Sequence, residues 1–450
     1  MVDKTLAYLD FSRLLDVIRK HSSITFGEDD IGAIRPLSDR AAIMERLDRT
    51  EALIGLVQWN GRIPFSTIPD IRPYVKRSVI RGSSLEPKEL LAVADFLDAC
   101  AGIGGFLKTA DHRPPYVENV IERIERLPDL YARIRKTINP DGFIEDSASY
   151  ELSRIRAELF SYRERIRRKL ERMMETAEIG SVLQDNYISI RNGRYVIPLK
   201  PNFNQAIQGI VHDHSHSLKT SFVEPVAIVE LNNAANILDK EEKEEEKRIL
   251  QDLTVFVGQR SETIVGNLMV IKELDLYHSL ALFAEQFACL KPDISVDGQV
   301  NIRGARNPFI MLSKPGKAVP IDIVMEPETD VMIISGPNAG GKTAALKTMG
   351  LLSLMAAAGL FVPAEGQAKI PLFPKIFAVL GDEQDISMEL SSFSAHISAI
   401  RDVLSRSGPH DLVLVDEIGG GTEPQEASAL AMALMDAFVK KRCRLVVTTH

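Results

Sequence analysis

The sequence has 450 residues, 45% of them hydrophobic and 26% charged, a composition typical of a globular protein of about two to four domains. A chain of this length is not a single small binding module. The formal net charge of −8 excludes a uniformly basic coat for nucleic acid but allows local basic patches. Cys100, Cys289 and Cys443 lie too far apart for a zinc motif or a disulfide framework. The N-terminal residues lack the pattern of a secretory signal, and the longest apolar run, 349–363, is too short to span a bilayer, so we expect a cytoplasmic protein with no membrane partner.

Residues 1–145 are expected to form a compact helical core domain. Apolar side chains recur at helical spacing near the N-terminus and again from 85 to 97. Between these stretches lies a connector, 61–73, that cannot be one helix because each of its prolines fixes φ and removes a hydrogen-bond donor.

Residues 146–290 are expected to form a stalk of two long helices with a small β-containing tip at about 183–225. The first helix, from 147 to about 177, has a coiled-coil-like apolar seam at Leu152, Ile155, Leu159, Tyr162, Ile166, Leu170 and Met173. The β-rich runs on both sides of Asn192-Gly193 predict a hairpin. A second long helix without proline is predicted from after Pro225 to about Cys289.

From 291 onward, short apolar strands alternate with glycine-rich turns and helices, which indicates an α/β domain with a parallel sheet. The run 331–335 reads as a buried strand, and a GxxxxGK[ST] loop and a helix follow it, the setting that a phosphate-binding loop requires. We predict that Lys342 reaches the β- and γ-phosphates of ATP and that Thr343 holds Mg²⁺. The residues predicted to bind the nucleotide here are Gly336, Pro337, Asn338, Ala339, Gly340, Gly341, Lys342 and Thr343.

A second apolar strand, 412–415, ends in the acidic pair Asp416-Glu417. Asp416 is suited to a second Mg²⁺ contact, and Glu417 to accepting the proton of the attacking water as a general base. The strand 445–449 ends at His450, where a γ-phosphate sensor could lie. The predicted catalytic residues are therefore Lys342, Glu417 and His450.

Four motifs together resemble the ATPase of MutS proteins, a branch of the ABC ATPases. They are the phosphate-binding loop, Ser391-Ser392-Phe393-Ser394-Ala395-His396-Ile397, Asp416-Glu417-Ile418-Gly419-Gly420-Gly421-Thr422, and Thr448-Thr449-His450. The remainder is similar to the second bacterial MutS family, through Ile68-Pro69-Asp70-Ile71-Arg72-Pro73, Ile190-Arg191-Asn192-Gly193-Arg194-Tyr195-Val196-Ile197-Pro198 and Glu230-Leu231-Asn232-Asn233.

This resemblance implies a multidomain fold: an all-α core, a long helical stalk with a small β-containing clamp tip, and an α/β P-loop ATPase domain of the ABC type at 291–450. It implies a homodimer formed through the ATPase domain, in which Ser391 and Ser392 belong to a signature loop that completes the partner's ATP site. It also implies that 419–422 form the loop after the acids and that His450 is the switch histidine.

Three departures from the family pattern qualify the resemblance. The two matches to the Phe-x-Glu wedge of mismatch-reading proteins, 26–28 and 283–285, fall in a turn and inside a long helix, so mismatch reading is not supported. Asn307 replaces the histidine of an Arg-His-Pro motif, which leaves stacking on the base to Phe309 or another residue. The chain ends on the switch strand and contains no Smr nuclease segment, so we expect a fragment without nuclease activity.

Basic residues at the tip, Arg191, Arg194 and Lys200, are predicted to contact nucleic acid, because the stalk would hold them away from an acidic body. The arginines between 163 and 172 are interspersed with glutamates, which favours an ion-paired, solvated helix face. His212, His214 and His216 alternate along an apparent strand, and a polar tip surface is favoured over a metal site because no fourth ligand is evident.

Three functions fit these patterns. The leading hypothesis is an ATP-hydrolysing dimeric clamp that binds branched or structured DNA and limits homologous recombination, with endonuclease activity only in a longer protein. The second is a ribosome-associated factor that uses the same clamp, on ribosomal RNA, at stalled or collided ribosomes. The third is a scaffold that binds nucleotide without hydrolysing it. Phosphate contacts carry little identity, so the sequence does not separate the first two.

Overall fold

The computed structural model describes residues 2–65, 68–201, 207–337, 340–380, 392–419 and 424–449, apart from the side chains of 2, 3, 392, 393 and 424. The chain divides into two compact units by its contacts. One unit comprises Met1–Ile68, Ala99–Glu125 and Gly266–His450, and the other comprises Pro69–Asp98 and Arg126–Val265. The predicted helical segment 1–145 therefore contributes residues to both units.

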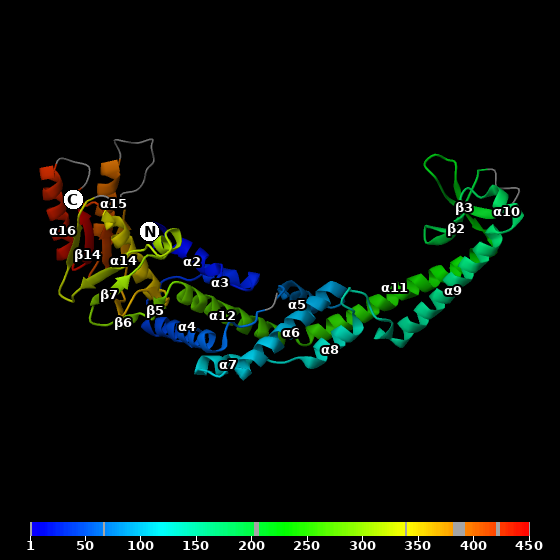
Figure 1. Cartoon of the computed structure of the whole chain (residues 1–450), viewed down its shortest axis with the longest axis horizontal. Helices are drawn as coiled ribbons and strands as arrows, with labels where there is room; N and C mark the ends of the chain where they lie inside the picture. The colour runs from blue at the N-terminus through cyan, green and yellow to red at the C-terminus, as the bar shows by residue number, and fades with distance from the viewer. Residues whose placement is uncertain are drawn as a thin grey trace. The chain divides into compact units, whose positions relative to one another are not determined.

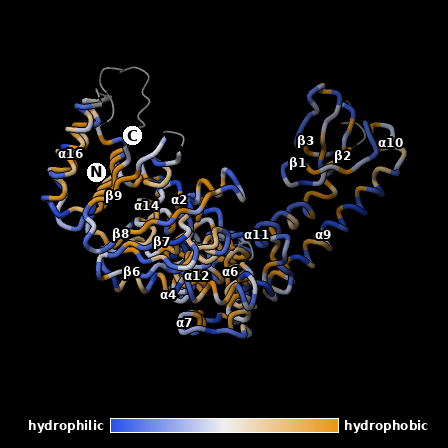
Figure 2. Tube along the Cα trace, turned by 60° about the vertical axis from the view of Figure 1, so that its left-hand side comes forward, coloured by the Kyte–Doolittle hydropathy of each residue, from blue (hydrophilic) through white to orange (hydrophobic). Residues whose placement is uncertain are grey.

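Two long antiparallel helices, α9 (Tyr150–Met174) and α11 (Val229–Gly258), lie side by side in the second unit (Figures 1 and 2). The side chain of Ser149 caps α9 by accepting a hydrogen bond from the amide of Leu152 at 3.0 Å. Five of the seven predicted seam residues are buried, Tyr162 and Met173 are half-buried, and Met174 is buried in addition. Shorter helices in this unit are α5 (Arg72–Ser78), α8 (Pro128–Thr137) and α10 (Ala177–Val182).

The second predicted stalk helix is two helices rather than one. The first, α11, ends at Gly258, and α12 (Ser261–Gln286) begins after a short break. A Cβ on Gly258 would lie 2.6 Å from the carbonyl oxygen of Ser78, so glycine lets the two backbones approach. Because glycine is a weak helix former and serine favours helix starts, the break has a local cause that the absence of proline did not reveal.

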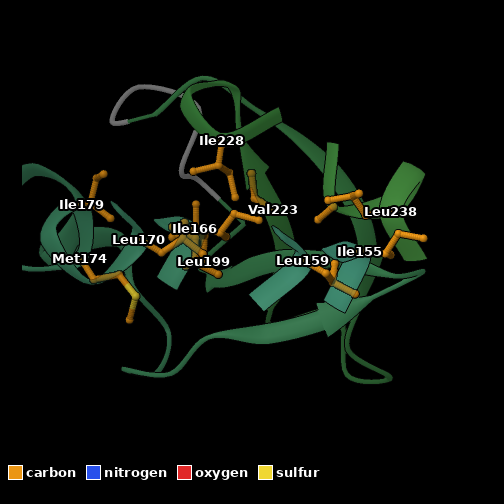
Figure 3. Close-up of a cluster of buried hydrophobic side chains, with 12 residues drawn as sticks. Ile155, Leu159, Ile166, Leu170, Met174, Ile179, Leu199, Val223, Ile228 and Leu238 are labelled. Atoms are coloured by element: carbon orange, nitrogen blue, oxygen red, sulfur yellow. The ribbon is translucent and has the colours of Figure 1, made fainter. Parts of the chain in front are cut away.

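The tip is a four-stranded antiparallel sheet in the order β1-β2-β4-β3, formed by β1 (Ser189–Arg191), β2 (Arg194–Leu199), β3 (Gly209–His214) and β4 (Ser221–Pro225). The predicted hairpin is confirmed: Asn192 and Gly193 both have positive φ, 51° and 74°, between the paired Arg191 and Arg194. Side chains of β2, β4, α9, α10 and α11 share one apolar core beneath the sheet (Figure 3).

The N-terminal part of the first unit contains the helices α1 (Val2–Tyr8), α2 (Phe11–Arg19), α3 (Glu28–Gly32), α4 (Arg40–Asn60) and α7 (Pro115–Arg123), and α12 belongs to this unit from Gly266 onward. Helix α6 (Pro87–Thr109) runs from the second unit into the first. By length and composition α6 is the one helix of the described residues that could cross a membrane, and 61% of its apolar window is buried inside the structure. The core helix of a globular protein has the same character.

The first unit also contains two four-stranded sheets. One has the order β6-β11-β7-β8 and mixed direction, with strands β6 (Asp293–Ser295), β7 (Val300–Ala305), β8 (Ile321–Met325) and β11 (Ala368–Pro371). The other is parallel in the order β12-β13-β14-β9, with strands β9 (Val331–Ser335), β12 (Ile376–Val379), β13 (Leu412–Val415) and β14 (Arg444–Thr449). The unit also contains a short antiparallel pair of strands, β5 (Cys289–Leu290) with β10 (Val362–Pro363), and the short helix α13 (Pro308–Ser313).

Helices α14 (Lys342–Ala357), α15 (Ser392–Arg406) and α16 (Pro424–Lys440) accompany the parallel sheet. A Cβ on Gly350 of α14 would lie 2.5 Å from a methyl carbon of Leu414 in β13, so the helix lies tightly on the sheet. All four strands are parallel, so the segments that leave their carboxyl ends meet at one edge. That edge receives the loop after β9, the acidic pair after β13 and the end of β14.

Candidate nucleotide site

Two glycines in the described part of the loop between β9 and α14 have positive φ. Gly336 and Gly341 have φ values of 148° and 82°, and Gly341 stands immediately before the first residue of α14. Lys342 is buried, and its ammonium donates a hydrogen bond of 2.6 Å to the carbonyl oxygen of Gly336. The positive charge therefore lies over the loop that the sequence predicts to hold phosphate.

The carboxylate of Asp416 joins this loop to the second acidic strand. Its Oδ2 accepts a hydrogen bond of 2.7 Å from the Thr343 hydroxyl, across a separation of 73 residues. Its Oδ1 accepts one from the hydroxyl of Thr448 in β14, and its amide donates to Val379 of β12 at 2.9 Å. Asp416 is 5% exposed. The predicted magnesium ligands, Thr343 and Asp416, are thus brought into contact.

Thr448 is a site residue that the sequence interpretation named only as part of the motif Thr448-Thr449-His450, without a role of its own. Its hydroxyl donates to Asp416 and accepts a hydrogen bond of 2.7 Å from the amide of Glu417. The available signal was a hydroxyl residue at the end of an otherwise apolar strand.

Glu417 has an exposed side chain on a constrained backbone. Its φ is +52°, a left-handed conformation that non-glycine residues adopt at a cost and that is found at functional sites. Gly419, with φ of 83°, follows, and a Cβ there would lie 2.5 Å from the carbonyl oxygen of Ala427. The chain therefore turns sharply after Glu417, and the turn presents the carboxylate at the edge where Asp416 and Lys342 lie.

An apolar cleft lies between β8, β9 and α14. It has a volume of about 160 Å³ and is lined by Ile321, Asp322, Ile323, Met332, Ile334, Ala345 and Met349.

Phe309, a predicted candidate for stacking on the base, lies in the connection between β7 and β8. Asn307 caps α13 by accepting a hydrogen bond of 2.9 Å from the amide of Phe309, and the guanidinium of Arg13 lies 4.6 Å from the centroid of the Phe309 ring. One face of Phe309 is therefore covered, which leaves less of the ring for stacking on a base.

At the tip, Arg194 belongs to a buried polar cluster. Its guanidinium donates to both oxygens of Glu224, at 2.7 and 3.0 Å, and to Asn233. Glu224 is fully buried and also contacts the His212 ring nitrogen at 2.6 Å and the Asn232 amide at 2.7 Å. Arg194 therefore neutralises an internal carboxylate, in addition to whatever it contacts outside the chain.

The other two predicted contact residues at the tip remain closer to solvent. Arg191 stacks on Phe222 at 4.0 Å from the ring centroid and lies 3.2 Å from the carboxylate of Asp213. Lys200 is exposed and donates to the carbonyl oxygen of Ser181 at 3.0 Å, a contact that leaves its charge uncompensated.

Most of the other histidines and arginines singled out in this unit take part in contacts within the chain. His212 contacts Glu224, His214 contacts Ser221 at 3.2 Å, and no group of three metal-ligating side chains occurs in the described part of the chain. On α9, Arg163 pairs with Asp239 at 3.2 Å, and Arg167 lies 3.5 Å from Glu164. The helix face is ion-paired, as the interspersed glutamates predict.

The family model for MutS domain V matches residues 332–450. Over its whole length the chain is 38% identical to "Endonuclease MutS2" of Bacillus cytotoxicus and 37% identical to the proteins of that name from Bacillus cereus and Bacillus anthracis. The chain belongs to the MutS family. It spans 57% of the length of these relatives. The two threonines, Asp416 and Glu417 all lie within domain V, whereas the tip cations lie outside it.

Several predicted residues of domain V lie outside the described residues. They are Asn338, Ala339, Ser391, His450 and the segment 420–422. Ser392 begins α15, and its side chain is also outside the description. The predicted nucleotide contacts of these residues, and the dimer that the signature loop implies, stay predictions.

Proposed function

We propose that this chain binds and hydrolyses ATP with Mg²⁺ at the carboxyl edge of its parallel sheet, as the motor of a nucleic-acid clamp. The observation that carries the proposal is the 2.7 Å hydrogen bond from Thr343 to Asp416. It joins the first turn of the helix after the glycine loop to the end of the acidic strand, the two parts that phosphoryl transfer needs side by side.

The donor set of this edge fits a magnesium ion. Thr343 and Asp416 supply a hydroxyl and a carboxylate, the oxygen ligands that Mg²⁺ prefers, and no Lys or Arg of the described residues forms an ion pair with Asp416. When bound, Mg²⁺ would neutralise negative charge on the phosphates of the nucleotide.

In this proposal, Lys342, the apolar cleft and Glu417 each have a separate role in binding or hydrolysis. Lys342 lies at the loop and supplies positive charge to the β- and γ-phosphates. The apolar cleft beside α14 is suited to the base, since its lining is mostly aliphatic. Glu417 takes the proton of the attacking water as the water oxygen bonds to the γ-phosphorus and the bond to the β-phosphate oxygen breaks.

The nucleic-acid role rests on family membership and on the charge at the tip. We propose that the chain acts in the cytoplasm as a homodimer through domain V, binds branched or structured DNA and limits recombination. Arg191 and Lys200 are the better-exposed candidates for phosphate contact, and Arg194 supports the sheet that presents them. The endonuclease named for the longer relatives is proposed for a whole protein and not for residues 1–450.

The ATPase proposal is tested by comparing Lys342→Ala with Glu417→Ala in the purified protein. We expect Lys342→Ala to weaken binding of a fluorescent ATP analogue, and Glu417→Ala to bind it normally while hydrolysis falls at least about 100-fold. Glu328→Ala, at an exposed site in the same unit, is the matched control. Loss of binding together with turnover in Glu417→Ala would contradict the assigned roles, and binding without turnover in the unaltered protein would support the scaffold function instead.

The nucleic-acid proposal is tested by measuring binding to four-way DNA junctions and co-sedimentation with ribosomes at matched salt. We expect tighter binding to the junction than to linear duplex. Preferential co-sedimentation with ribosomes would replace this substrate by ribosomal RNA.

A further inference from the structure

Helix α9 has a second basic flank besides the ion-paired face that contains Arg163 and Arg167. Arg165, Lys169 and Arg172 are exposed and follow one another at spacings of four and three residues. Side chains at these spacings lie on the same side of an α-helix, so the three cations form one row, the basic stripe. At about 1.5 Å per residue, the basic stripe extends for about 10 Å along the helix.

The charges of the basic stripe are not neutralised within the part of the chain that the structure describes. No carboxylate there forms an ion pair with any of its three cations. Every other arginine of α9 does pair with a carboxylate, namely Arg154, Arg156, Arg163, Arg167 and Arg168. The helix therefore has one flank of ion pairs and one flank of uncompensated positive charge.

Two of the three cations are held in place by neutral groups. The guanidinium of Arg165 lies 5.2 Å from the centroid of the Tyr162 ring, and the ammonium of Lys169 donates a hydrogen bond of 2.6 Å to the carbonyl oxygen of Ala227. Neither contact cancels the charge, but both restrict the side chain. A cation that is already restricted loses less conformational entropy when it binds an anion.

The spacing also sets like charges against each other. Cations three or four residues apart on a helix repel, which weakens the helix. Glu175 is the only carboxylate in the sequence at that distance from a member of the basic stripe, and it forms no ion pair with Arg172. A polyanion would relieve the repulsion. One strand of a nucleic-acid duplex carries a charge about every 3.4 Å, so about three phosphates match the length of the basic stripe.

We propose that the basic stripe binds the phosphate backbone of a nucleic-acid duplex lying along α9. This inference rests on the proposed nucleic-acid role and extends the contact beyond Arg191 and Lys200. The carbonyl that holds Lys169 belongs to the 3₁₀ turn η4 (Val226–Ile228), which directly follows strand β4 of the tip. The middle of the basic stripe therefore lies beside the end of the tip sheet. The alternative is a solvated helix face without a partner.

The test compares equal losses of charge from the two flanks of α9. The stripe variant combines Arg165→Ala, Lys169→Ala and Arg172→Ala, and the control variant combines Arg163→Ala, Arg167→Ala and Arg168→Ala. We expect the stripe variant to bind a four-way DNA junction at least about tenfold more weakly and to reduce the slope of log affinity against log salt by about 2–3. The control variant should change affinity less than about threefold.

Stability and chemical protection provide independent readouts. Because the stripe variant removes repulsive neighbours, we expect its melting temperature not to fall. In the unaltered protein, junction DNA should slow acetylation of Lys169 by acetic anhydride severalfold. It should leave Lys243, an exposed lysine of α11, unprotected.

The possible results separate this inference from the proposed function. Unchanged affinity and salt slope in the stripe variant, equal losses in both variants, or an unprotected Lys169 overturn the basic stripe while the protein still binds nucleic acid. Absence of binding in the unaltered protein overturns the proposed nucleic-acid role and the basic stripe with it. A larger loss with an RNA duplex than with junction DNA supports the basic stripe and identifies RNA as the source of the phosphates.

Discussion

Asp416 in the first unit and Glu224 in the second are both buried carboxylates held by several donors, and the two are satisfied differently. Asp416 accepts from the hydroxyls of Thr343 and Thr448, which are neutral, so its negative charge stays uncompensated among the described residues. Glu224 accepts from Arg194, which cancels its charge inside the tip, and from Asn232. The charge of Glu224 is thus compensated within the tip, whereas the charge of Asp416 would be available to the proposed Mg²⁺.

The largest effect on stability is expected from changing Glu224. Glu224→Ala removes a fully buried carboxylate and leaves Arg194, whose side chain is 24% exposed, without its partner, which should destabilise the protein by about 3 kcal/mol. Denaturant unfolding followed by circular dichroism measures this. Glu230→Ala, an exposed glutamate nearby, should change stability by less than about 0.5 kcal/mol, and an equally small effect at Glu224 would mean that the cluster is not structural.

The second carboxylate should respond in activity rather than in stability. Asp416→Asn keeps the shape and an acceptor for one threonine, so unfolding should change by about 1 kcal/mol, while Mg²⁺-dependent ATP hydrolysis should fall about 100-fold. Asp436→Asn, on the exposed face of α16, controls for loss of a surface charge. Full activity in Asp416→Asn would show that the uncompensated charge has no part in the reaction.

A third test sharpens the role of the tip cations. Arg191→Ala with Lys200→Ala should leave stability almost unchanged, weaken junction binding about tenfold, and reduce the slope of log affinity against log salt by about 1–2. Arg194→Ala should instead destabilise the tip. Lys440→Ala, in the other unit, tests for a general charge effect. An unaltered salt slope in the double variant would move the contact to another surface.

The smallest expected effect is at the hairpin that holds these residues. Gly193 has φ of +74°, which alanine adopts with strain, so Gly193→Ala should lower stability by about 1 kcal/mol. The melting temperature of the tip provides the measurement. Gly102→Ala, inside α6 with open space around it, should have the opposite sign because alanine favours helix.

Local patterns were sufficient for the elements that local physics determines. The seam of α9 follows from the spacing of its apolar residues, and the hairpin from Asn192-Gly193. The contact between Thr343 and Asp416 was predictable in outline because parallel strands release their loops at one edge.

Pairings between distant strands were not accessible in the same way. Thr448 meets Asp416 only because β14 lies beside β13, a neighbour relation that no local pattern contains. Glu224 stands in a short strand, where a charged residue is normally expected to face solvent, and its burial depends on Arg194 from another strand.

The position of β14 has a consequence for synthesis of the protein. It is the last described strand in chain order, yet it lies inside the parallel sheet, between β13 and β9, and it supplies the hydroxyl that joins Asp416 to Glu417. On a translating ribosome, β9 and β13 can emerge and collapse with their helices, but they cannot be bridged until residues 444–449 have left the exit tunnel. A nascent chain therefore completes the proposed nucleotide edge only after residues 444–449 have emerged, and a nucleotide bound at that edge could stabilise only the intermediates that form afterwards.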